Sequence, residues 1–145
     1  MSSAPTKLDQ ILGLHLRLAH GAVLRHFAEH FTELDLSQKQ VSVLWLAHDQ
    51  PGIAQTDLAR RMQMDRATTM AIVHALERKG LLSRQPSEAD RRKIAFSLTA
   101  RGEEVLNAAR HAIGQHEKWL TQQFSSRERR QLIAMLRRIH QAPSS

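Results

Sequence analysis

Cationic and hydroxyl side chains gather in two segments of this 145-residue chain, and their chemistry suits contact with nucleic acid. In residues 65–78, Arg66 and Thr68 begin a helical pattern that continues through His74. An arginine guanidinium can donate paired hydrogen bonds to guanine O6 and N7, or it can clamp a phosphate. In residues 90–93, three consecutive cations suit the enhanced negative potential of a narrow A·T-rich minor groove. Both segments are therefore candidate DNA contacts.

Asp90 is an anion in a segment that is expected to face phosphate. We expect its carboxylate to pair with a neighbouring arginine and to set the direction of that guanidinium. The alternative for residues 90–93 is a solvated charge cluster, and the alternative for residues 65–78 is a solvated amphipathic helix. The elements around the two segments decide between these readings.

The order of elements predicts a winged helix-turn-helix. Residues 52–62 read as a short helix, a tight turn follows at 63–64, and a second helix runs from 65 to 79 with Asp65 as its N-cap. Residues 81–85 and 93–98 then read as two short strands, and the second alternates through Ile94, Phe96 and Leu98. In such a fold one helix enters a DNA groove and the hairpin loop lies beside it.

The second helix has one apolar face and one open face. Thr69, Ile72, Val73 and Leu76 recur at core-facing spacing, whereas small residues at 67 and 71 would let the other face approach the groove floor. With the flanking residues of the first helix and the hairpin, the candidate DNA contacts are Gln55, Thr56, Arg66, Ala67, Thr68, Met70, His74, Arg78, Arg84, Asp90, Arg91 and Arg92.

The two ends of the chain carry further amphipathic helices. Residues 7–31 and 99–123 have helical apolar spacing, and Ser37-x-x-Gln40 and Ser125-x-x-Glu128 are capping boxes that open two more helices. The winged lobe of residues 37–99 can form its core without the apolar side chains of segments 7–36 and 100–140, so these side chains need another surface to cover them. A second copy of the chain would cover them in a two-fold dimer, and the alternative is that they pack on their own lobe.

Composition narrows the class of protein. The net charge of +7 favours a polyanionic partner, either nucleic acid or an anionic membrane surface, and the absence of cysteine excludes disulfides and thiolate chemistry. No apolar run is long enough to span a bilayer, and the first residues lack the apolar segment of a signal peptide. We therefore expect a cytoplasmic, single-domain, mainly α-helical protein of residues 1–145 that is not an enzyme, needs no cofactor and does not bind membranes.

Several motifs of this chain resemble those of the MarR family of bacterial transcription regulators. They are Asp65-Arg-Ala-Thr-Thr69, Leu76-Glu-Arg-Lys-Gly-Leu-Leu82, Asp90-Arg-Arg92 and Leu98-Thr-Ala-Arg-Gly102. The resemblance implies a homodimer that binds an inverted-repeat (palindromic) operator in double-stranded DNA, usually as a repressor, and that a small molecule releases. It also implies that Arg92 enters the minor groove and that Asp90 orients it.

The same resemblance implies a ligand pocket lined by the first two long helices. The candidate lining residues are His15, Leu18, Ala19, Ala22, Trp45 and His48, with Arg17 and Arg25 nearby. One aromatic and several cationic groups on otherwise apolar faces suggest an aromatic carboxylate or its acyl-CoA thioester as the effector. The alternative is that Trp45 is an ordinary core residue.

Three other functions are open at this level. His26 and His30 share a helix face, but two ligands do not make a metal site, and we predict no metal. The basic charge also fits an architectural protein that binds DNA largely without sequence preference. A regulator of constant activity that binds no small molecule is the third possibility.

Overall fold

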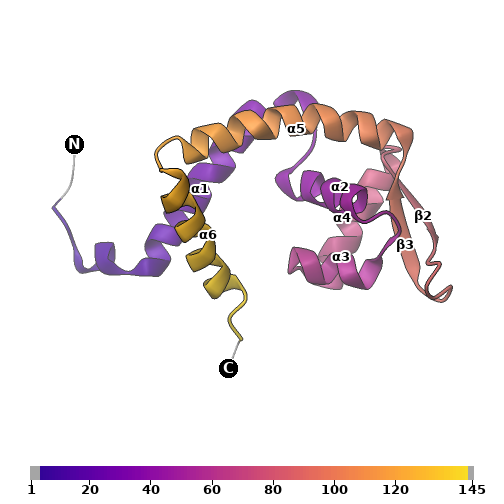
Figure 1. Ribbon diagram of the computed structural model, residues 1–145, viewed down its shortest axis with the longest axis horizontal. Coiled ribbons are helices and arrows are strands. Elements are labelled where there is room, and N and C mark those ends of the chain that lie inside the picture. The colour runs from indigo at the N-terminus through magenta and orange to yellow at the C-terminus, as the bar shows by residue number, and fades with distance from the viewer. Residues whose placement is uncertain (1–3, 144–145) are drawn as a thin grey trace.

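The computed structural model describes residues 4–143, with the helices at the two ends of the chain separated from a winged lobe (Figure 1). The helices α1 (Leu12–His30) and α6 (Ser126–His140) lie at one end, and the long α5 (Ala100–Thr121) spans the molecule. The winged lobe contains α2 (Gln38–Asp49), α3 (Gln55–Met62), α4 (Arg66–Arg78) and a small sheet. This is the mainly α, winged helix-turn-helix architecture that the sequence predicts.

The helix-turn-helix forms as local capping chemistry dictates. The side chain of Asp65 accepts a hydrogen bond from the Thr68 N–H, which satisfies a free donor at the start of α4. Gln63 takes a left-handed backbone conformation with φ of 51°, and this residue makes the tight turn between α3 and α4. The predicted N-cap and turn are both confirmed.

The start of the first helix of this motif was predicted wrongly. The segment Ile53–Ala54 is a short strand, β1, and α3 begins only at Gln55. Gly52 has φ of 81°, and its N–H donates to the Phe96 carbonyl oxygen, so the chain is turned into the sheet before the helix begins. This pairing partner lies far along the chain, and local spacing does not reveal it.

The sheet has three antiparallel strands in the order β1-β3-β2. The strands β2 (Leu82–Pro86) and β3 (Ile94–Leu98) form the predicted hairpin, and residues 87–93 make its loop, the wing. Phe96 at the centre of β3 has no exposed surface and pairs with Ile53 on one side and Arg84 on the other.

The core of the molecule lies in the winged lobe. Leu44, Leu58 and Leu76 come from three different helices and are completely buried. α5 joins this core through Leu106, and its first turn approaches the sheet closely because residue 102 is a glycine. A methyl group on Gly102 would lie 2.1 Å from the carbonyl oxygen of Leu81, so no side chain fits there.

The N-terminal segment departs from the continuous helix predicted for residues 7–31. A short 3₁₀ helix (Lys7–Gln10) comes first, Ile11 is extended, and α1 follows. The side chain of His15 makes a 2.6 Å hydrogen bond with the carbonyl oxygen of Asp9, which replaces a backbone partner at the break. The capping boxes at Ser37 and Ser125 and the Thr99 cap are as predicted.

Apolar side chains on α6 and on the first turns of the chain are exposed. They are Leu8, Ile11, Leu12, Leu18, Leu132, Ile133, Met135, Leu136 and Ile139, and none of the α6 residues is buried. Among residues 4–143, no helix is both long and apolar enough to cross a membrane.

Candidate nucleic-acid interface and effector cavity

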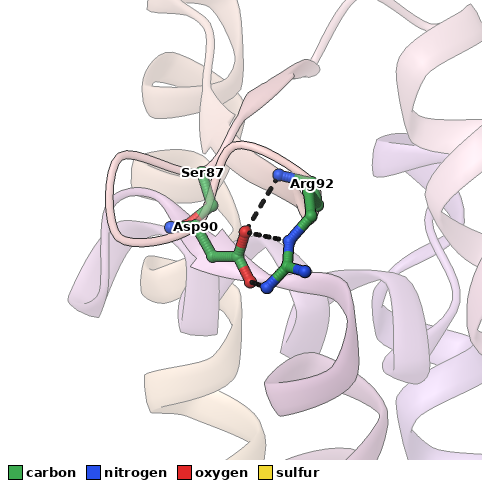
Figure 2. Close-up of polar contacts among 3 residues, drawn as sticks. All are labelled: Ser87, Asp90 and Arg92. Carbon is green, nitrogen blue, oxygen red and sulfur yellow. Dashed lines mark hydrogen bonds and ion pairs between the residues drawn. The ribbon is translucent and has the colours of Figure 1, made fainter.

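The wing presents one arginine on a fixed carboxylate (Figure 2). Arg92 donates to Asp90 from Nε (3.1 Å to Oδ1) and from Nη2 (3.2 Å to Oδ2), and its backbone N–H also donates to Oδ1. Asp90 is itself anchored through its N–H to the Ser87 hydroxyl, and Ser87 is buried. The expected pairing of Asp90 with an arginine is therefore present, and it is bidentate.

This geometry leaves the guanidinium of Arg92 in solvent. The Arg92 side chain is 91% exposed, whereas that of Asp90 is 31% exposed beneath it. The hydrogen bonds from Arg92 hold the pKa of Asp90 below its usual value, so the carboxylate stays ionised at neutral pH. The pair restricts the direction of the arginine while its remaining N–H groups stay free to contact an anion.

The start of α4 lies beside the wing. A depression of about 170 Å³ is lined by Gln55 and Thr56 from α3, Arg66 from α4, and Arg92, Lys93 and Ile94 from the hairpin. Ala54 caps α3 without a side-chain hydrogen bond, so N–H groups at the first turn of α3 have no side-chain acceptor there. We name this feature the wing–helix depression; it joins three cations to a helix N-terminus, which is favourable for a phosphate.

The predicted reading face of α4 is open to solvent. Arg66, Ala67, Ala71, His74 and Arg78 are all exposed, whereas Thr69, Val73 and Leu76 are buried. The hydroxyl of Thr69 donates to the carbonyl oxygen of Asp65, so this residue belongs to the core face as predicted. Arg91 and Thr56 are also exposed.

Four candidate DNA contacts are buried or engaged within the fold. Arg84 donates to Glu77 at 2.9 Å and lies over the ring of Phe96, so its guanidinium is tied to α4 and the sheet. Gln55 is buried, Met70 packs against the core, and the hydroxyl of Thr68 donates to Asp65. These four side chains are less available to DNA than the sequence alone suggested.

A cavity of about 380 Å³ lies between α1, α2 and α5. It is lined by Val23, Phe27, Gln38, Val41, Ser42, Trp45, Leu46, Ile113, His116, Glu117 and Leu120. Most of these side chains are apolar, and the few polar ones are spread over α2 and α5, as is common in sites for small organic molecules. We call this space the interhelical cavity.

Of the predicted ligand-binding residues, Trp45 lines the interhelical cavity and the other five do not. His15, Leu18 and Ala19 are exposed on α1, and Ala22 is half-buried beside the lining residue Val23. The Nδ1 atom of His48 lies 2.8 Å from Glu103, so this ring is engaged with α5. The face of Trp45 carries the guanidinium of Arg110 at 5.0 Å from the ring centre.

His116 is one of the ten cavity-lining residues that the sequence analysis did not predict, and it is the one that carries a titratable ring. It is buried, and its Nδ1 lies 2.7 Å from Nδ1 of His26 on α1. His26 in turn stacks on His30 and on Trp119, each with ring centres 3.9 Å apart. A signal was available, because Ile113, His116 and Leu120 fall on one apolar helical stripe, where a histidine stands out.

No group of three or more potential metal ligands is found among residues 4–143. The spacing of His26 and His30 does bring the two rings together, but as a stack rather than as the corner of a coordination site. His30 makes its hydrogen bond to the carbonyl oxygen of His26.

Comparison with known proteins places the chain among transcription regulators. Residues 36–94 match the sequence profile of the MarR family. A putative transcriptional regulatory protein for the hcr operon of Thauera aromatica is 31% identical over 134 residues, which is 92% of this chain and 81% of the relative. The homoprotocatechuate degradative operon repressor of Escherichia coli is 27% identical over 125 residues, 86% of this chain and 84% of the relative.

Among solved structures, the transcriptional repressor CouR bound to a 23-mer DNA duplex has the same fold. It is 31% identical with a TM-score of 0.88, and the match covers 97% of this chain and 100% of that chain.

Proposed function

The chain belongs to the MarR family of transcriptional regulators, and we propose that it binds a palindromic operator as a homodimer and releases it when a small aromatic acid enters the interhelical cavity. In this proposal it acts in the cytoplasm as a repressor and carries out no catalysis. The observation that carries it is the wing–helix depression, where Thr56, Arg66 and Arg92 from three elements face one space.

Each part of this surface has a distinct role in the proposal. The free N–H groups at the start of α3 and the Thr56 hydroxyl bind a phosphate, which fixes the lobe on the duplex. Arg66, Ala67, Ala71 and His74 lie along the major groove, where Arg66 reads a guanine. Arg92 enters the adjacent minor groove in the direction that Asp90 sets.

The exposed apolar side chains of α1 and α6 support the homodimer. Leu132, Leu136 and Ile139 recur at helical spacing on α6, yet each retains a third or more of its surface in the single chain. A two-fold partner that covers them would place two α4 helices about 34–36 Å apart, which is one turn of DNA.

The interhelical cavity supports the effector class. Its volume of about 380 Å³ accommodates a monocyclic aromatic acid beside Trp45, while the bulk of an acyl-CoA thioester would have to extend outside it. The relative from E. coli is a repressor of homoprotocatechuate degradation by name, and homoprotocatechuate is an aromatic carboxylic acid.

Fluorescence anisotropy with two duplexes tests the regulator. One duplex carries the upstream region of the gene and the other a scrambled copy, each at two salt concentrations. A preference of about a thousandfold or more for the native duplex is expected. Equal affinity for both duplexes, with a steep loss of affinity at the higher salt concentration, would indicate an architectural protein that binds DNA mainly through phosphate contacts.

Arg92→Ala and Asp90→Asn test the wing within the same assay. Arg92→Ala is expected to weaken operator binding by roughly 10- to 100-fold and to relax the A·T preference at the flanks. Asp90→Asn removes a negative charge near DNA. If the wing contributes only its net charge, this variant should bind the operator more tightly. If Asp90 orients Arg92, as proposed, the variant should bind more weakly. Arg17→Ala, at an exposed position on α1, is the matched control and should leave affinity unchanged.

A further inference from the structure

Two histidines from helices far apart in the sequence share one hydrogen bond. Nδ1 of His26 on α1 and Nδ1 of His116 on α5 are 2.7 Å apart. Two lone pairs or two N–H groups at that distance would repel, so one proton must lie between the rings. We call His26 and His116 the histidine pair.

The histidine pair forms part of the wall of the interhelical cavity. His116 lines the cavity and is 6% exposed, and the rings of Phe27 and Phe31 meet it edge-on. Trp119 stacks on His26. Within residues 4–143, the second ring nitrogen of His116, Nε2, has no hydrogen-bond partner, so it is the polar atom that this ring can offer to a bound molecule.

We propose that the histidine pair recognises the acidic group of the effector: it takes up one proton as a carboxylate enters the cavity, and Nε2–H of His116 donates to that carboxylate. This inference rests on the effector-responsive regulator proposed above and names the group that reads the ligand's charge. It assigns the pair to a small, singly charged aromatic acid rather than to a neutral aromatic compound.

The proton balance is simple. In the neutral pair one Nδ1–H donates to the other Nδ1, so one ring has a hydrogen on Nδ1 and the other has a hydrogen on Nε2. A proton from solvent then binds the remaining bare Nε2. The hydrogen bond between the rings is kept, and both Nε2 atoms carry hydrogen. The pair becomes a monocation that faces a monoanion across a hydrogen bond. A second proton would place two N–H groups opposite each other at 2.7 Å, so the pair binds one proton only.

Burial, more than the surrounding charges, disfavours the proton on the empty pair. Burial, and then the positive charge of a neighbouring imidazole, lower the pKa of both His26 and His116 below the ordinary value. His30 and Glu29 face the pair from α1 and Glu117 from α5; the two carboxylates favour the proton and His30 opposes it. The residues of α2 that line the cavity carry no charge.

The sign of the pH dependence follows from this balance. Above the lowered pKa the empty pair is unprotonated, and the bound carboxylate raises that pKa, so binding draws a proton from solvent. Affinity for an acid is therefore greatest at low pH and is lost as pH rises. Glu117 repels an anion at the same wall, but it is exposed, and water screens its charge.

Benzoate and benzamide are the matched probes, because they share size and ring and differ in charge. Both tryptophans of the chain lie at this site, Trp45 on the cavity wall and Trp119 against His26, so their fluorescence reports binding. Between about pH 6.5 and 8, the Kd for benzoate should rise by up to tenfold per unit, whereas that for benzamide should stay flat. A flat profile for benzoate, or no binding of benzoate, overturns the inference.

Two variants separate the pair from the other histidines. His116→Gln keeps an N–H donor but cannot take up a proton, so its Kd for benzoate should lose the pH dependence. His20→Gln is the control, because His20 is exposed on α1 and does not line the cavity, and it should keep the wild-type slope. An unchanged slope in His116→Gln would assign the proton to another group.

Nitrogen NMR of ¹⁵N-histidine wild-type protein needs no substitution. The shared proton should give coupled titration of the two rings, and benzoate should add a single proton to the pair at neutral pH, so that both Nε2 atoms but only one Nδ1 carry hydrogen. Independent titration of the two rings overturns the inference. Operator binding, measured in parallel, distinguishes two outcomes. Specific DNA binding with a flat benzoate profile would overturn only the role of the histidine pair. Binding to DNA without sequence preference would overturn the proposed regulator itself.

Discussion

The winged lobe and the helices at the two ends of the chain bury their apolar side chains to different degrees. In the winged lobe Leu44, Leu58 and Leu76 have no exposed surface. On α6, Leu132 and Leu136 remain 37% and 36% exposed. The lobe therefore has its own core, whereas the ends need a surface that the single chain does not supply.

The same contrast separates the two proposed sites. The DNA surface is built inside the lobe, from the local Asp90–Arg92 pair on the wing and from the side chains of α3, α4 and the hairpin that meet at the wing–helix depression. The interhelical cavity lies where the end helices α1 and α5 meet α2 of the lobe. A ligand there contacts both regions at once, so it can change how the lobe is held relative to the end helices.

The largest effect is expected from charges on α6. Burying a fully exposed leucine contributes about 1.5–3 kcal/mol. Leu132 and Leu136 are 37% and 36% exposed, so each of the four copies in a dimer would contribute about a third of that. Leu132→Glu with Leu136→Glu should therefore weaken dimerisation by about 2–4 kcal/mol, to which the cost of burying four carboxylates is added. Light scattering across a concentration series should show a monomer. Circular dichroism should show the lobe still folded, because neither leucine belongs to its core.

Arg130→Gln is the control for this pair of substitutions. Residue 130 lies on the other side of α6 from positions 132 and 136 by helical spacing, so the variant should remain a dimer. A dimer that persists with both glutamates in place would place the interface elsewhere on the molecule.

A smaller but still large effect is expected inside the lobe. Leu44→Ala should lower the free energy of unfolding by about 2–5 kcal/mol, because it leaves a cavity in a fully packed core. Urea unfolding of the dilute chain measures it. The same truncation on α6, Leu136→Ala, should leave the free energy of unfolding of the dilute chain nearly unchanged. An equal loss of unfolding free energy in the two variants would contradict the contrast between the winged lobe and the end helices.

Local chemistry made much of the fold predictable. The caps at Ser37, Asp65, Thr99 and Ser125 act within three or four residues, so the sequence alone reveals the helices that they open. The pairing of Asp90 with an arginine was predictable for the same reason, since the two residues are neighbours on one loop.

Long-range pairing explains what was missed. Strand β1 exists because Ile53 pairs with Phe96, and no local pattern in residues 53–54 records this partner. The wall of the interhelical cavity was predicted from α1 and α2, whereas α5 supplies His116, which is 90 residues from His26. Trp45 does line this cavity, because its position depends on α2 alone, and its contact with a ligand stays a prediction.

The smallest effect is expected at the joint between the two regions. In Gly102→Ala the new methyl group meets the Leu81 carbonyl oxygen at 2.1 Å, and that atom belongs to the backbone and cannot rotate away. Overpacking of this kind should cost about 1–3 kcal/mol and should loosen the first turn of α5 from the sheet. Thermal unfolding and amide exchange at Leu81 and Leu82 measure both consequences.

Gly114→Ala, further along the same helix, is the matched control. A methyl group there meets nothing within 4 Å, so only helix propensity changes, and the variant should be more stable by about 0.5–1 kcal/mol. Opposite signs for the same substitution on one helix would show that close contact, and not glycine flexibility, fixes α5 to the winged lobe. Stabilisation by Gly102→Ala would mean that the joint yields, and that the two regions are less firmly coupled than this contact requires.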